Sequence, residues 1–179
     1  MSIRSRLRRV LNGLALGYLG LAAWNGHVDR RTRNLAFPLP LDGEPYTYDW
    51  PGGRIFFTRR GQGEPVLLVH GIYAGAESHE FRRVFSPLAD RYQVYAYDLL
   101  GFGHSARPNV RYSGPLYVRL LTDFVRQVIG RPTTVIANSL SAAHAIRAAD
   151  GERNLIRRLI LLAPSAGTSR GRRGIASEA

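Results

Sequence analysis

The sequence predicts an α/β fold in which a mostly parallel, twisted sheet has helices on both faces. Short apolar runs of strand length recur along the chain, segments with helical periodicity separate them, and turn residues mark their ends. This alternation favours parallel pairing, because consecutive parallel strands need a crossover connection that a helix provides. The chain has 179 residues, 45% of them hydrophobic, which suits one domain with a hydrophobic core.

Each element follows from a local pattern. Pro51-Gly52-Gly53 predicts a turn between two short strands, and the apolar run 66–69 predicts a strand buried on both faces. Apolar residues at helical spacing predict the helices, and runs of branched or aromatic residues predict the later strands. In chain order we expect two strands within 46–58, a strand at 66–69, a helix at 80–91, a strand at 92–97, a helix at 115–129, a strand at 133–137, a helix at 140–149 and a strand at 155–163.

The basic charge is concentrated in arginines near the two ends of the chain. The formal net charge is +12, and no lysine occurs. Neither a base-stacking motif nor a helix-turn-helix pattern accompanies the charge, so we expect no nucleic-acid partner. Cysteine is absent, which excludes disulfides, thiolate metal sites and cysteine nucleophiles. We expect neither a cofactor nor a metal ion.

The first 24 residues form a separate segment. A basic start over residues 1–9 precedes the apolar run 10–24, which is shorter than the ~20 residues that a membrane-spanning helix needs. This layout predicts an export signal or a membrane anchor, and therefore a membrane-associated or exported protein. A helix packed on a cytoplasmic domain is the alternative. Residues 25–45 contain prolines and polar residues and predict a linker before a domain over 46–166, which a low-complexity tail over 167–179 follows.

Three motifs follow three of the predicted strands. His70-Gly71-Ile72 follows the strand at 66–69, and Asp98-Leu-Leu-Gly-Phe-Gly-His-Ser105 follows the strand at 92–97. Ala137-Asn-Ser139-Leu-Ser141 joins the strand at 133–137 directly to a helix. A sharp turn of that kind needs small residues two before and two after the serine, and Ala137 and Ser141 meet this requirement.

In this order and spacing the motifs resemble those of the α/β-hydrolase family, over residues 53–166. The family's usual G-x-S-x-G is here Ala-x-Ser-x-Ser, so the exact motif is absent. The resemblance implies a partial α/β-hydrolase fold. It also implies that Ser139 is the nucleophile, and that the backbone N–H groups of Ile72 and Leu140 form the oxyanion hole.

The resemblance gives supporting roles to four other residues near these motifs. Gly71 allows close approach of the backbone to the substrate, and Tyr73 is a candidate to line the pocket. His70 holds the oxyanion loop, and Asp98 begins a structural turn. His144 lies five positions after Ser139 on the same predicted helix, so we expect it to point away from the turn, as a surface or packed histidine.

In the family, the acid and the histidine of the triad follow the serine in the chain. Residues 167–179 contain no histidine and no strand pattern, so we expect the chain to be truncated or frame-shifted. The first hypothesis is a serine hydrolase acting on a small ester or related acyl compound, weakly active or inactive as given. The alternative is a non-catalytic, membrane-associated module built on half of the hydrolase sheet.

Overall fold

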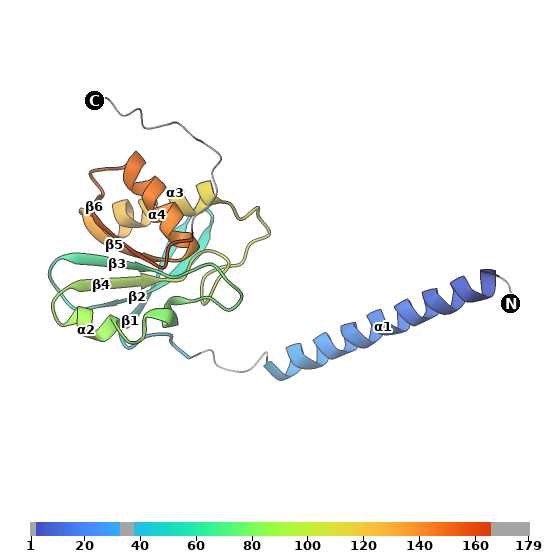
Figure 1. Ribbon diagram of the computed structural model, residues 1–179. Helices are drawn as coiled ribbons and strands as arrows, with labels where there is room; N and C mark the ends of the chain where they lie inside the picture. Colours follow the sequence, from blue (N-terminus) through green and yellow to red (C-terminus); the bar gives the residue numbers. More distant parts are fainter. Residues whose placement is uncertain (1–2, 33–37, 166–179) are drawn as a thin grey trace, which may run out of the picture. The chain divides into compact units, whose positions relative to one another are not determined.

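The computed structural model describes residues 3–32 and 38–165 (Figure 1). The chain divides after Pro38 into two compact units, which are described separately. The first contains one helix, α1 (Ile3–Thr32), and the second contains a six-stranded sheet with its helices. The predicted tail over 167–179 lies outside the described residues.

Helix α1 includes the whole apolar run 10–24 and continues through residues 25–32, which the sequence analysis assigned to a linker. The first part of the predicted linker, up to Thr32, is therefore helical. No proline interrupts the segment, and Arg30 and Arg31 lie in the last turn, where positive charge stabilises the helix dipole. Large apolar side chains are exposed along α1: Leu11, Leu14, Leu16, Tyr18, Leu19, Leu21 and Trp24. None of the helices that the structure describes combines the length and the apolarity that a membrane span requires.

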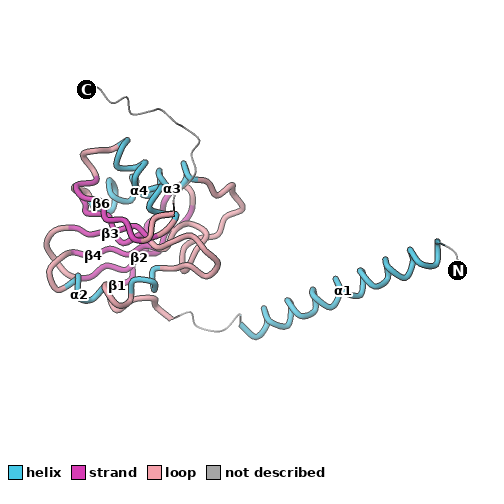
Figure 2. Tube along the Cα trace, viewed as in Figure 1, coloured by secondary structure: helices cyan, strands magenta, loops and turns pink. Residues whose placement is uncertain are grey.

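The second unit confirms the predicted open, mostly parallel sheet. Its strands lie in the order β1-β2-β4-β3-β5-β6, and Figure 2 shows them as one continuous layer. The pairs β3–β4, β3–β5 and β5–β6 are parallel, while the hairpin β1–β2 and the pair β2–β4 are antiparallel. The bounds are β1 (Glu44–Trp50), β2 (Gly53–Arg60), β3 (Pro65–Val69), β4 (Gln93–Tyr97), β5 (Thr133–Asn138) and β6 (Ile156–Leu162).

Helices cover both faces of the sheet, as expected from the alternating pattern. Alternate residues of β3 and β4 belong to two separate apolar clusters. One cluster lies beneath α3 (Gly114–Phe124), the π-helical turn η2 (Val125–Ile129) and α4 (Leu140–Gly151). The other lies beneath the 3-10 turn η1 (Ser78–Phe81) and α2 (Phe85–Ala89).

The single helix predicted over 80–91 is instead two short elements, η1 and α2. Pro87 explains the break, because proline lacks an N–H and is tolerated only in the first turn of a helix. Helix α2 therefore begins at Phe85, two residues before the proline. The three motifs of the sequence follow the ends of β3, β4 and β5, and β3 and β4 end in fully buried residues. Because these strands are parallel neighbours, the motifs lie at the same carboxyl edge of the sheet.

Candidate active site

Ser139 lies at a sharp turn between β5 and α4. Its backbone angles, φ 52° and ψ −125°, form a combination that a residue with a side chain rarely adopts. The surrounding structure therefore holds the backbone of Ser139 in a strained conformation. The flanking Ala137 and Ser141 are both buried, as a tight turn requires. The Oγ of Ser139 is 3.1 Å from the Oγ of Ser165.

The loop after β3 lies directly against this turn. A Cβ added to Gly71 would be 3.3 Å from the Cβ of Ser139, so a side chain at Gly71 would crowd the serine. Leu140 is the first residue of α4, and its N–H therefore has no acceptor within the helix. Ile72 and Leu140 line one cavity of about 720 Å³. The two segments predicted to form an oxyanion hole thus line one cavity, whereas Ser139 precedes Leu140 in the chain and is not itself among the lining residues.

His70 is fully occupied by two hydrogen bonds. Its Nδ1 donates to the Gly71 carbonyl (2.6 Å), and its Nε2 accepts from the Leu99 N–H (3.0 Å). Burial lowers the pKa of His70, although the Gly71 carbonyl and the charges of Asp98 and Glu80 oppose this shift. A neutral imidazole with both nitrogens engaged has no capacity left to accept a proton from Ser139, so His70 holds the loop.

Asp98 makes the contacts of a structural turn. One carboxylate oxygen accepts from the Ser78 N–H (2.7 Å) and the other from the His104 N–H (2.8 Å). The hydroxyl of Ser105 donates to the Asp98 carbonyl (2.6 Å) and accepts from the Phe56 N–H (2.9 Å). The turn after β4 is therefore fastened to the neighbouring strand and to η1.

Glu80 connects the loop after β3 to the serine turn, and no pattern in the sequence indicated it. Its carboxylate accepts hydrogen bonds from the Gly71 N–H (3.3 Å), the Tyr73 hydroxyl (3.1 Å) and the Asn138 side-chain amide (2.6 Å). Tyr73 itself is half-exposed and is not among the residues that line the 720 Å³ cavity, so its expected role in the pocket stays a prediction.

The cavity is mainly apolar and aromatic. Its walls include Ile72, Phe102, Pro108, Tyr112, Tyr117 and Leu140, together with Arg107, Asn109, Ser113 and His144. The expectation for His144 was incomplete. It is a packed histidine, with its ring centroid 5.5 Å from that of Tyr117, yet it also lines the cavity next to the serine turn.

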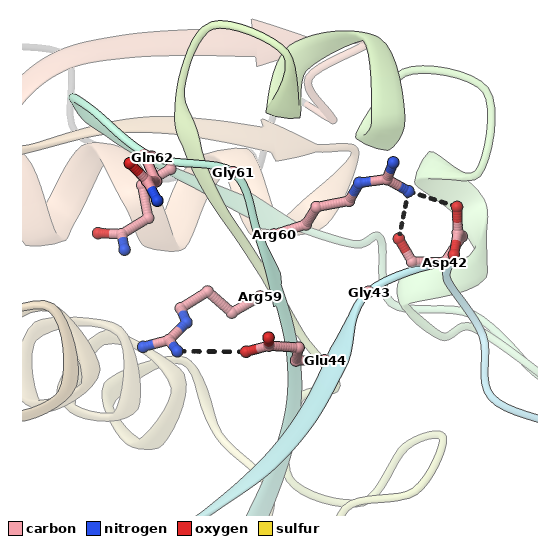
Figure 3. Close-up of a pocket in the computed structure, with 8 residues that line it drawn as sticks. Asp42, Gly43, Glu44, Arg59, Arg60, Gly61 and Gln62 are labelled. Carbon is pink, nitrogen blue, oxygen red and sulfur yellow. Dashed lines mark hydrogen bonds and ion pairs between the residues drawn. The ribbon is translucent and has the colours of Figure 1, made fainter.

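A second pocket, of about 560 Å³, lies at the other end of the strands (Figure 3). It is lined by the ends of β2 and the start of β4, opposite to the edge that follows Val69 and Tyr97. Arg60 is paired with Asp42, and Arg59 with Glu44, as Figure 3 shows. Both arginines of this pocket are already paired with carboxylates, so we assign it no chemistry.

The described residues contain no complete triad. In this part of the chain no histidine is hydrogen-bonded to Ser139, and no three His, Asp or Glu side chains are grouped closely enough to hold a metal ion.

Comparison with known proteins identifies a family. Residues 66–178 match the family described as "Alpha/beta hydrolase family". The chain is 35% identical over 108 residues to 2-hydroxy-6-oxo-6-(2'-aminophenyl)hexa-2,4-dienoic acid hydrolase of Metapseudomonas resinovorans, a match covering 59% of this chain and 37% of that protein. It is 37% identical over 79 residues to haloalkane dehalogenase 2 of Mycobacterium tuberculosis, covering 44% of this chain and 27% of the relative.

Among solved structures, the chain is similar to a serine hydrolase involved in carbazole degradation, the CarC enzyme. The TM-score is 0.66 at 29% sequence identity, and the match covers 72% of this chain and 50% of that one. The chain thus spans half or less of the length of these proteins.

Proposed function

Because the chain belongs to the alpha/beta hydrolase family, we propose that it contains the nucleophile part of a serine hydrolase site, acting on a small ester or a related acyl compound. The observation that supports this most is the strained backbone of Ser139 between β5 and α4, in contact range of the loop at Gly71. A serine that only capped a helix would have ordinary backbone angles, and its backbone would not be strained.

In this proposal Ser139 Oγ attacks the carbonyl carbon, and the negative charge that develops on the carbonyl oxygen is received by the N–H groups of Ile72 and Leu140. The N-terminus of α4 adds its positive dipole at the same place. A serine here also argues against dehalogenase chemistry, which uses a carboxylate nucleophile, although a dehalogenase is among the relatives.

We also propose that these 179 residues catalyse ester hydrolysis at a low rate. A base must come within hydrogen-bond reach of the serine, and no histidine of the described residues does so. We therefore expect slow turnover of a short-chain aryl ester. The alternative, a non-catalytic membrane-associated module, gains no support from the family match or from the described helices.

The test is covalent labelling by an alkyl fluorophosphonate, followed by peptide mass spectrometry. Ser139 Oγ forms a bond to phosphorus, the P–F bond breaks, and the hydroxyl proton leaves with fluoride. Because no described histidine activates Ser139, we expect slow labelling of Ser139 at high reagent concentration, its loss in Ser139→Ala and its retention in Ser86→Ala, a serine on α2 away from the cavity. Equal labelling of the Ser139→Ala chain would rule the proposal out.

A further inference from the structure

We propose that the 720 Å³ cavity takes a flat aromatic group bearing an uncharged hydroxyl, and that His144 recognises this hydroxyl. The inference rests on the proposed function in one respect: it takes the ligand of the cavity to be the substrate of Ser139. The recognition itself follows from the cavity walls, from the state of the imidazole and from the charges around it.

The walls favour a flat, apolar group. Phe102, Tyr112 and Tyr117 all line the cavity. The hydroxyls of the two tyrosines already donate to backbone carbonyls, Tyr112 to Pro108 (2.8 Å) and Tyr117 to Leu100 (3.2 Å). These rings therefore contribute apolar surface, against which an aromatic ligand gains both burial and ring–ring contact.

His144 is a polar group in this wall that the hydrolase mechanism does not use. Its Nδ1 is buried and has no hydrogen-bond partner within the described part of the chain. Burial, and then the charge of Arg147, lower the pKa of His144, so the imidazole is neutral at neutral pH. A neutral imidazole has one donor and one acceptor nitrogen, and a hydroxyl can satisfy either one.

The surrounding charges exclude a cationic ligand. Among the described residues no carboxylate lines the cavity, whereas Arg107 does. Arg147 is close as well, because a Cβ added to Gly114 in the cavity wall would be 3.7 Å from its Nη1. The same Cβ would be 3.5 Å from Cε1 of His144, so the absence of a side chain at Gly114 leaves room beside the imidazole.

The experiment measures dissociation constants of acetophenone, 3- and 4-hydroxyacetophenone and benzylammonium for the full chain by NMR titration at pH 7.5. We expect one hydroxyacetophenone to bind about fivefold more tightly than acetophenone, the gain of one neutral hydrogen bond. Benzylammonium should bind most weakly. His144→Phe keeps a ring beside Tyr117 and removes both nitrogens, so it should bind acetophenone normally and lose the fivefold preference.

Two further variants keep the test decisive. His79→Phe, a histidine bonded to the Pro40 carbonyl and absent from the cavity wall, should retain the preference. If His144→Phe does not fold, Gly114→Ala narrows the space beside the imidazole and should weaken binding of the hydroxyl compound specifically. Equal preference in the wild type and His144→Phe, or binding of benzoate, titrated alongside, that is tighter than that of both hydroxyacetophenones, would overturn the inference.

These outcomes separate the inference from the proposed function. Ketone binding needs no nucleophile, so Ser139→Ala should keep the hydroxyl preference. Fluorophosphonate labelling of Ser139 without any hydroxyl preference overturns only the role of His144. A hydroxyl preference without Ser139 labelling overturns only the hydrolase proposal.

Discussion

The hydroxyl of Ser141 donates a 2.6 Å hydrogen bond to the backbone carbonyl of His70. Both residues are buried, and the bond joins the first turn of α4 to the loop that follows β3. The serine therefore does more than satisfy the demand for a small residue two positions after Ser139. It fixes the separation between the two segments that carry Ile72 and Leu140, which both line the cavity.

Ser141→Ala should destabilise the second unit. The substitution removes the hydrogen bond and leaves the buried His70 carbonyl without its partner, which costs about 1–3 kcal/mol of the free energy of unfolding. Urea unfolding measures the change. Ser113→Ala is the matched control, because Ser113 caps α3 without a side-chain hydrogen bond. Similar losses in the two variants would show that the Ser141–His70 bond is not a significant contributor.

Gly103→Ala should cost more than Gly75→Ala. Both glycines have positive φ, 48° and 78°, so alanine at either position is strained by about 1–2 kcal/mol. Nothing lies within 4 Å of a Cβ added to Gly75, whereas a Cβ on Gly103 would overlap the carboxylate of Asp98. That carboxylate would have to give up its bonds to Ser78 and His104. Thermal unfolding that ranks the two variants equally would contradict this account of the turn.

Stability should fall as the pH drops below about 6.5. Burial lowers the pKa of the fully buried His70 below its ordinary 6.5, so the unfolded chain binds the proton more readily. The contribution of His70 to the free energy of unfolding is complete above the pKa of the unfolded chain and is lost as the pH falls through the pKa of the folded chain. The free energy of unfolding falls by at most about 1.4 kcal/mol per pH unit.

Urea unfolding between pH 7.5 and 5.5 measures this dependence. His70→Asn should reduce it and leave the smaller part that comes from His144, whose pKa is also lowered by burial, while His27→Asn on α1, outside the second unit, should leave it unchanged. An undiminished slope in His70→Asn would assign the pH dependence to other groups.

The chain should self-associate through β6. This strand is at one edge of the sheet, and Ile160 and Leu162 are 39% and 41% exposed. Unpaired backbone groups beside exposed apolar side chains pair readily with another chain. Ile160→Lys should shift the chain towards monomer in sedimentation experiments, and Val110→Lys, at a loop residue 44% exposed, should not. A wild-type chain that stays monomeric at high concentration would refute the prediction.

Local patterns were sufficient to predict most strands and helices and the position of the serine turn. The contacts that complete the site are not local. Glu80 and Asn138 are 58 positions apart, and Ser141 and His70 are 71 apart, so no short motif indicates either bond. The pattern at Phe81, Val84, Phe85 and Leu88 suggested one helix, but the proline at 87 limited it to a single turn beginning at Phe85.

The sequence placed His144 relative to Ser139, but the ring that packs against His144 belongs to Tyr117 on another helix. That contact depends on how α3 and α4 pack, which periodicity does not specify. Export or membrane association of the N-terminal segment stays a prediction, and fractionation of a tagged chain with and without residues 1–24 would test it.

The most direct test of the site is a crystal structure of the chain with phenylboronic acid, which forms a tetrahedral adduct on a nucleophilic serine. We predict boron bonded to Ser139 Oγ, with one boron-bound oxygen at ~2.7–3.1 Å from the backbone nitrogens of both Ile72 and Leu140. A boronate bound elsewhere, or an adduct on Ser139 whose oxygens reach neither nitrogen, would contradict the assignment of nucleophile and oxyanion hole.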